Sequence, residues 1–309
     1  MMKHIIQLII ILFLTVGWSA NVLAQTEMDA IMMNKKQFCN GPAYMYSSWD
    51  HYWEGKLNRT NENLGRVSTQ SIMYMAAYGI NGKLNVLAGV PYLWTKASAG
   101  TLHGSRGLQD LSLFLKWKPL SETIGTNKIA VFALFGFSTP LTNYQIDYLP
   151  LTIGLGTTNA IMRGMVDFQH KRFSVTGSAA YIRRSNVKID RSSYYDTQAH
   201  LTNEVEIPDA AQYQLRAGYR GKYLLAEALL TNWTTLGGFD ITRNNMPFPS
   251  NRMNATTIGF ALKYTVRSYT HLSLIAGSNY TLAGRNMGQA TSYNAGIFYA
   301  FYFKQRQQQ

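Results

Sequence analysis

The stretch Asn294-Ala-Gly-Ile-Phe-Tyr-Ala-Phe-Tyr-Phe303 is the strongest indication of the fold class of this chain. Its side chains alternate between two faces, one of which carries Ile297, Tyr299, Phe301 and Phe303 and the other Gly296, Phe298, Ala300 and Tyr302. A period of two indicates a β-strand. A wholly apolar face that ends in aromatic residues is typical of a strand that meets lipid and its interface. The stretch resembles the C-terminal insertion signal of outer-membrane β-barrels, so we expect residues 294–303 to be recognised by the outer-membrane assembly machinery.

The N-terminal end of the chain also indicates a protein that is exported toward the outer membrane. Residues 1–24 have a basic start at Lys3, an apolar run over 5–17, and small residues before Gln25. The apolar run is too short to cross a bilayer as a helix, which takes about 20 residues. The pattern predicts a secretory signal peptide, with a membrane anchor as the alternative. A lipoprotein is disfavoured because position 25 is Gln and not Cys.

Composition sets further bounds. The chain has 309 residues, of which 15% are charged and 13% aromatic, and all-β barrels of this length form one domain. Cys39 is the only cysteine, so an intrachain disulfide is excluded. The net charge of +13 comes without a lysine-rich run, which argues against nucleic acid as a partner. Outer-membrane lipid, the phosphates of lipopolysaccharide and an anionic solute remain as partners of this charge.

Twelve candidate strands follow the signal peptide. Short and long connections alternate between them, with a hairpin signal at Asn81-Gly82 and long connections such as 139–158 and 185–210. Bacterial outer-membrane barrels have an even number of antiparallel strands, short periplasmic turns and long extracellular loops. We therefore expect an all-β transmembrane antiparallel barrel. Its strands are expected near 43–59, 67–80, 83–96, 108–119, 128–138, 159–169, 172–184, 211–220, 222–232, 253–265, 271–282 and 291–303.

This pattern predicts four regions in the chain. They are the signal peptide (1–24), an N-terminal periplasmic tail or small plug (25–42), the barrel (43–303) and a polar periplasmic tail (304–309). If 25–42 is a plug, Phe38 and Met32-Met33 could pack in the lumen. We expect a monomer in the outer membrane of a Gram-negative-type bacterium.

The two faces of the strands differ in charge. The outward sets carry no charged residue, as a hydrocarbon environment demands, and include Leu111, Leu113, Leu115 and Trp117. Aromatic residues gather at strand ends, which predicts two interfacial girdles. We expect the opposite, inward faces to hold Asp50, Glu54, Lys56, Asn85, Asp110, Lys116, Lys118, Lys128, Arg163, Asp167, Gln212, Gln214, Arg216, Arg220, Glu227, Lys263 and Asn279.

The inward charges suggest passive uptake of small molecules. In a twelve-stranded lumen, an excess of positive charge favours anions or acids. The candidate solute-binding residues are Lys116, Arg163, Asp167, Arg216, Glu227 and Lys263. The alternative for each is that it pairs with another charge simply to fill the barrel.

Two other function classes compete with transport. A structural or surface-interaction barrel could use its long loops for a partner. An outer-membrane lipid hydrolase would need a Ser–His pair with a third orienting group. His51 lies near Ser47 and Ser48, but no third partner is evident, so we do not expect an enzyme. The chain has no cluster at metal-ligand spacing and no phosphate-binding loop, and we expect neither a metal nor a cofactor.

Residues 107–117, Gly-Leu-Gln-Asp-Leu-Ser-Leu-Phe-Leu-Lys-Trp, resemble a recurring strand of the MetA-pathway of phenol degradation family. That strand reads roughly Gly-x-Gly-Asp, then alternating apolar residues, then Lys-Tyr. Here Gln109 replaces the second Gly and Trp117 replaces Tyr. The segments 135–140 and 154–159 look like the family's next strand and loop. The resemblance implies a transporter-like barrel similar in plan to long-chain fatty-acid channels, and uptake of small hydrophobic or aromatic compounds. Aromatic acids satisfy both this implication and the charge pattern.

Overall fold

The computed structural model describes residues 25–241 and 246–303. The expected signal peptide (1–24) and polar tail (304–309) lie outside the described residues. Within the described residues the structure is built of β-strands, and no helix is long and apolar enough to span a membrane.

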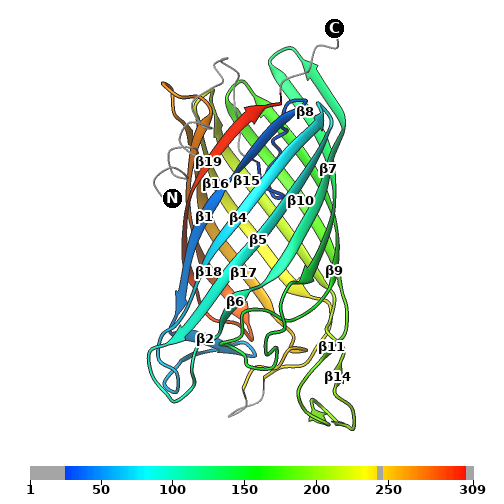
Figure 1. Ribbon diagram of the computed structural model, residues 1–309, viewed down its shortest axis with the longest axis vertical. Coiled ribbons are helices and arrows are strands. Elements are labelled where there is room, and N and C mark those ends of the chain that lie inside the picture. The colour runs from blue at the N-terminus through cyan, green and yellow to red at the C-terminus, as the bar shows by residue number, and fades with distance from the viewer. Residues whose placement is uncertain (1–24, 242–245, 304–309) are drawn as a thin grey trace, which may run out of the picture.

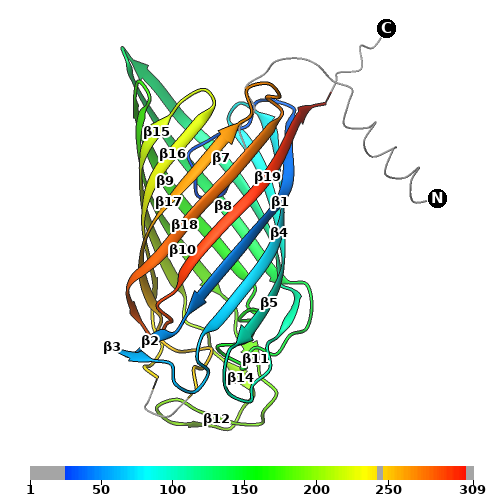
Figure 2. The same ribbon diagram turned by 90° about the vertical axis from the view of Figure 1, so that its left-hand side faces the viewer.

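Twelve long antiparallel strands form the wall of a closed barrel (Figure 1). Consecutive strands pair along the chain, and β1 pairs with β19 to close the sheet (Figure 2). Closure is obligatory in lipid, which offers backbone groups no hydrogen-bond partner. The strands are β1 (Gln37–Trp49), β4 (Val67–Asn81), β5 (Leu84–Ala97), β7 (Asp110–Ile124), β8 (Asn127–Pro140), β9 (Asn159–His170), β10 (Phe173–Arg184), β15 (Ala210–Arg220), β16 (Leu224–Thr235), β17 (Asn254–Thr265), β18 (Leu272–Arg285) and β19 (Thr291–Tyr302).

The connections separate by length to the two ends of the barrel, as expected. Short turns lie at one end together with the start of β1 and the end of β19, and this end is periplasmic. The long loops lie at the extracellular end, which is the lower end in Figure 1. Seven short strands decorate these loops: β2 (His51–Glu54), β3 (Leu57–Thr60), β6 (Arg106–Leu108), β11 (Val187–Lys188), β12 (Tyr194–Tyr195), β13 (Ala199–His200) and β14 (Glu204–Val205).

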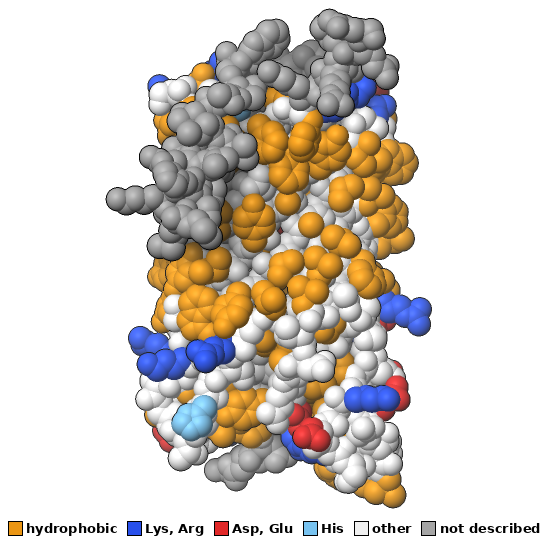
Figure 3. Space-filling view, viewed as in Figure 1, with side chains coloured by type: hydrophobic (Ala, Val, Ile, Leu, Met, Phe, Trp, Pro, Cys, Tyr) orange, Lys and Arg blue, Asp and Glu red, His pale blue; other side chains and the backbone are white. Residues whose placement is uncertain are grey.

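The outer face of the wall is an apolar belt. Leu113, Leu115 and Trp117 on β7 are exposed, as are Ile297 on β19 and Phe135 on β8. The space-filling view shows hydrophobic side chains over the middle of the barrel, whereas charged side chains lie toward its ends (Figure 3). This distribution is that of a protein embedded in the outer membrane of a Gram-negative-type bacterium.

The first strand differs from the expected one. β1 begins at Gln37 and ends at Trp49, whereas the expected strand covered 43–59. The second half of that range forms the extracellular hairpin of β2 and β3. The sequence Gly41-Pro42 hides the true start, because proline cannot donate a ladder hydrogen bond. In the structure Pro42 keeps its place opposite Tyr74 of β4, while the register with β19 passes from Asn40–Tyr299 to Ala43–Gly296.

Candidate functional site

The barrel interior holds all six residues that the strand alternation pointed to. Their side chains come from β7, β9, β15, β16 and β17, and each residue is at least nine-tenths buried. The exposed fractions are 0% for Lys116, 4% for Arg163, 5% for Asp167, 7% for Arg216, 3% for Glu227 and 6% for Lys263. Burial of so many charges requires partners, and the partners place five of the six residues in three groups. The sixth, Lys263, lines the middle and inner chambers described below.

The first group is a network of ion pairs around Arg220. The Arg220 Nε atom lies 2.9 Å from Oε1 of Glu227, and its Nη1 atom lies 2.8 Å from Oδ1 of Asp167. Arg216 Nη2 lies 2.7 Å from Oε2 of Glu227, and Thr176 donates a hydrogen bond to Asp167. Two arginines and two carboxylates thus neutralise each other on β9, β15 and β16. Asp167, Arg216 and Glu227 thus pair with other charges inside the barrel, which is the alternative to solute binding that the sequence left open.

The second group is Lys116, whose partners belong to the N-terminal residues before β1 and not to the strands of the wall. Its Nζ atom lies 2.8 Å from the carbonyl oxygen of Thr26, 2.5 Å from that of Asp29 and 3.1 Å from Oδ1 of Asp29. Gln25 shares a hydrogen bond with Asn85 on β5. Residues 25–33, which we call the inner segment, therefore lie inside the lumen against β5 and β7. These contacts correspond to the plug alternative for the N-terminal region.

Apolar contacts hold the inner segment at its other positions. Met33 is 1% exposed and packs in a cluster with Cys39, Phe298 and Ala300 of the seam strands. Ala30 packs in a second cluster with residues of β8 and β9, against which Met32 also rests. Met32 and Met33 thus pack against side chains of the wall strands, whereas Phe38 lies elsewhere. Its ring contacts Phe301 and Phe303 on the outward face.

The third group is Arg163 on β9, whose hydrogen-bond partners are neutral. Nη1 donates to Ser178 Oγ at 3.2 Å, and Nη2 donates to Gln212 Oε1 at 2.5 Å. Its Nε atom is buried and has no hydrogen-bond acceptor among the described residues. Arg163 therefore differs from Arg216 and Arg220, which both form ion pairs with carboxylates.

The inner segment divides the lumen into three cavities. An outer chamber of about 360 Å³ lies toward the extracellular loops and includes Glu27, Met28 and Arg163 in its wall. A middle chamber of about 560 Å³ extends along the seam side of the lumen and is bounded by Gln25–Asp29. An inner chamber of about 310 Å³ opens at the periplasmic end and touches Ala30–Met32. Residues of the inner segment thus border every chamber.

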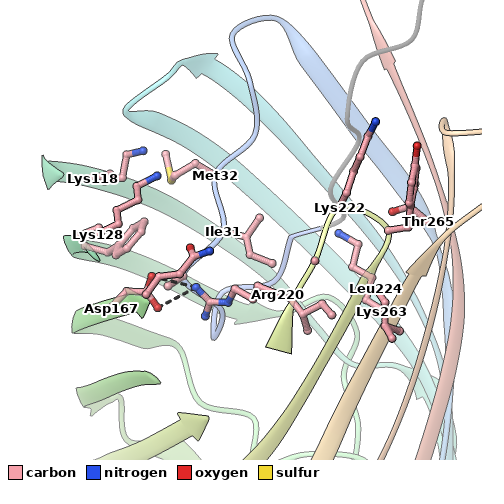
Figure 4. A pocket seen from close by; sticks show the side chains of 17 residues that line it. Ile31, Met32, Lys118, Lys128, Asp167, Arg220, Lys222, Leu224, Lys263 and Thr265 are labelled. Atoms are coloured by element: carbon pink, nitrogen blue, oxygen red, sulfur yellow. Dashed lines mark hydrogen bonds and ion pairs between the residues drawn. The ribbon is translucent and has the colours of Figure 1, made fainter. Parts of the chain in front are cut away.

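The inner chamber is strongly cationic (Figure 4). Five basic residues and one acidic residue line it: Lys118, Lys128, Arg220, Lys222, Lys263 and Asp167. The close-up shows Asp167 joined to Arg220 on one side of the cavity, with Lys118 and Lys128 on the same side and Lys222 and Lys263 across from them. The excess of positive charge creates a local field that attracts anions.

The middle chamber has a different lining. Met28, Met45, Met73 and Met75 provide flexible apolar side chains, and Phe298 adds an aromatic ring. Gln212, Gln214, Arg216 and Lys263 supply polar groups to the same cavity. Methionine adapts to irregular apolar shapes because its chain is unbranched and its sulfur is polarisable. The chamber therefore accepts an apolar body beside a polar or charged head.

The described parts of the extracellular loops pack and hydrogen-bond with one another. Ile146, Val187, Ile189, Val205 and Ile207 make a small buried core between two of them. In a third loop, the Asp240 carboxylate receives hydrogen bonds from Arg285 at 2.7 and 2.5 Å and from Asn286 at 2.7 Å. These bonds hold the pKa of Asp240 at about 2, below its usual value. The loop contact is therefore kept as pH falls until the carboxylate protonates near that value.

Three of the expected inward charges lie outside the lumen. Asp50, Glu54 and Lys56 belong to the extracellular hairpin region, where Asp50 pairs with Arg66 and Glu54 pairs with Arg59. The error follows from the misplaced first strand, since their alternation was counted along a strand that ends at Trp49. His51 is in the same hairpin, and its ring contacts Asp50 and Thr60 rather than a serine. Within residues 25–241 and 246–303, no group of three His, Cys, Asp or Glu side chains could hold a metal ion.

Sequence reasoning missed several residues of the site. Asp29 and Glu27 come from a segment without periodicity, so no pattern assigned them a face. Trp233 and Arg184 line the outer chamber near strand ends, where the sequence could not distinguish a lumenal side chain from a girdle residue or a loop residue. Trp233 could have been found from its spacing, because it lies six residues after Glu227 on β16 and an even spacing places both side chains on one face of the strand.

Comparison with known proteins supports the fold. The structure is similar to the COG4313 outer membrane channel from Pseudomonas putida F1, with a TM-score of 0.71 and 13% identity over 90% of this chain and 100% of that chain. The translocator domain of the autotransporter NalP from Neisseria meningitidis matches 87% of this chain with a TM-score of 0.46 and 10% identity. The CymD monoaromatic hydrocarbon channel matches 88% of it with a TM-score of 0.38 and 12% identity. No protein-family model matches the sequence. No curated protein matches it either.

Proposed function

We propose that this chain is a passive outer-membrane channel for small organic solutes, with a preference for hydrophobic or aromatic acids. The observation that carries the proposal is the divided lumen. Three cavities follow one another from the extracellular loops to the periplasmic turns, and the residues between them belong to the inner segment. That segment is held by Lys116 and two apolar clusters, not by the strand ladder. Its displacement would join the chambers without changing the wall.

The preference for acids rests on the linings of two chambers. A solute with a negative head is attracted by the lysines of the inner chamber. A solute with an apolar body gains contact with the methionines of the middle chamber. Arg216 and Lys263 line the same chamber and supply positive charge to it. An organic acid matches both linings, whereas a simple inorganic anion matches only the first.

Flux into liposomes tests the proposal. Wild-type protein and a variant that lacks residues 25–33 are each reconstituted and compared with protein-free liposomes. We expect benzoate to enter faster than a phenyl-substituted ammonium ion of similar size through both proteins. The deletion is expected to raise both fluxes several-fold because it removes the barrier between the chambers. β1 begins at Gln37, so the deletion leaves the wall intact.

The control for this experiment is the folded state of the barrel, measured by the shift in gel mobility between unheated and heated samples. If the folded deletion variant passes neither ion faster than protein-free liposomes do, the channel proposal is wrong. That result would favour a barrel that serves a structural or surface-interaction role.

A further inference from the structure

A single row of lumenal residues crosses the outer chamber. The strand registers place Arg163 of β9 opposite Ala180 of β10, Ala180 opposite Gln212 of β15, and Gln212 opposite Trp233 of β16. Arg163, Gln212 and Trp233 all line the chamber. Neighbouring strands are about 4.8 Å apart, so the backbones of Arg163 and Trp233 are separated by roughly 14 Å. Ala180 lies between them and contributes only a methyl group.

The apolar end of this row is built around Trp233. Its indole packs against the cluster of Ala180, Ile182 and Ala210, beside Ile161. Ile161, Ile182 and Phe114 extend the apolar wall of the chamber. A flat ring in this space would contact aromatic and branched aliphatic side chains, which favour planar apolar ligands.

The polar end of the row is the Arg163 guanidinium. It is 4% exposed and donates hydrogen bonds to the neutral groups of Ser178 and Gln212. Its Nε atom is buried without an acceptor among the described residues. Leaving a buried donor without an acceptor costs free energy, so such groups point to a missing partner. A carboxylate is the partner that a guanidinium fork prefers.

We propose that the outer chamber is a binding site for a monocarboxylate with one flat apolar ring, held by Arg163 at its carboxylate and by Trp233 at its ring. The volume of about 360 Å³ lies at the small end of ligand cavities and suits a molecule of one ring. The site deepens the proposed function and rests on it only in that the ligand must reach the lumen. Arg184, on the chamber wall near the loops, adds a second positive charge.

Glu27 of the inner segment adds a competing charge. It lines the same chamber and attracts Arg163 electrostatically. A ligand carboxylate must therefore displace part of the interaction between Glu27 and Arg163. Neutralising Glu27 should strengthen binding of the acid, which is an effect that a purely structural role of Arg163 does not produce. The competition also couples occupancy of the chamber to the position of the inner segment.

Titration calorimetry in detergent tests the site, with benzoate, benzamide and acetate as probes. We expect wild-type protein to bind benzoate more tightly than benzamide, which has the same ring without the charge, and more tightly than acetate, which lacks the ring. Arg163→Gln should weaken benzoate binding at least about tenfold, and Arg163→Lys by less, because lysine keeps the charge but loses the fork. Glu27→Gln should tighten benzoate binding a few-fold.

Arg183→Gln is the matched control. Arg183 is on β10 beside the row, but its side chain is exposed, so the same change of charge should leave benzoate binding unaltered. Gel mobility confirms that each variant is folded. Equal affinity of benzoate for wild type and Arg163→Gln, or equal affinity of benzamide and benzoate for wild type, would overturn the site. If benzoate passes through the protein but binds Arg163→Gln as tightly as wild type, the channel proposal stands and the site is rejected. If benzoate binding depends on Arg163 but no flux is measured, the site stands and the channel proposal is rejected.

Discussion

Lys116 shows how much one buried residue controls in this barrel. It is fully buried, and its ammonium group bonds to Thr26, Asp29 and the carbonyl oxygen of Ile31. Among the ion pairs of residues 25–241 and 246–303, the pair between Lys116 and Asp29 is the one that joins the inner segment to the wall. Removal of one partner from a buried pair costs about 3–5 kcal/mol, because the other charge stays buried alone. The segment can escape that cost by leaving the lumen.

Lys116→Met should therefore release the inner segment. We expect single-channel conductance in planar bilayers to rise several-fold over wild type, while the folded barrel is retained. Lys83→Met is the control, since Lys83 is exposed in the periplasmic turn between β4 and β5, and this change should leave the conductance unaltered. Equal conductance of wild type and Lys116→Met would show that the lysine does not hold the barrier.

For single residues, the sequence predicted which side chains face the lumen but not which of them pair with one another. Alternation along β7, β9 and β15–β17 is set by backbone geometry alone, so the lumenal place of Lys116, Arg163 and Glu227 followed from counting. Which charges meet depends on strand register and on the aperiodic inner segment. The pair Lys116–Asp29 joins residues 87 positions apart and has no local signature.

Among the elements, β1 carries a constraint that its neighbours lack. A Cβ atom at Gly41 would lie 1.9 Å from the carbonyl oxygen of Ile297 on β19. This contact is at the seam where the first and last strands meet, and it involves backbone, which cannot turn aside as a side chain can. Glycine is required there by close approach of the two strands.

Gly41→Ala should weaken the closed barrel. We expect a fall in the free energy of unfolding of at least about 1–3 kcal/mol, as for overpacked sites. The measurement is the urea concentration at which half the protein loses its unheated gel mobility. Gly164→Ala on β9 provides the comparison, because nothing lies within 4 Å of a Cβ atom at that position. Similar midpoints for the two variants would contradict the constraint.

Element boundaries show where sequence reasoning ends. Eleven of the expected strands match long strands of the barrel to within a few residues, because lipid demands uninterrupted apolar alternation on each. The first strand fails because Gly41-Pro42 mimics the end of an irregular segment, and the β2–β3 hairpin then continues the alternation beyond Trp49. Only the pairing of both ends of β1 with β4 and β19 resolves the ambiguity.

The charge of the whole molecule leads to a prediction about ion selectivity. With five bases and one acid around the periplasmic mouth, wild-type protein in a salt gradient should give a reversal potential that favours anions. Replacing Lys118, Lys128 and Lys222 together with Gln should move that potential toward zero. The control replaces Lys56, Lys96 and Lys188, which are exposed on or near the extracellular loops, and should leave the potential nearly unchanged. If the reversal potential of the first triple variant equals that of wild type, the lysines of the inner chamber do not set the ion selectivity.

The order of the chain along the barrel has a consequence for biogenesis. The inner segment precedes β1, yet Met33 packs against Phe298 and Ala300 of the final strand, and Lys116 holds it from β7. The Met33 cluster joins side chains of β1 and β19, so it is complete only when these two strands have paired. We therefore expect the inner segment, which precedes β1 in the chain, to take its final place only after the barrel has closed. On this order of events, a newly closed barrel has an unblocked lumen for a time.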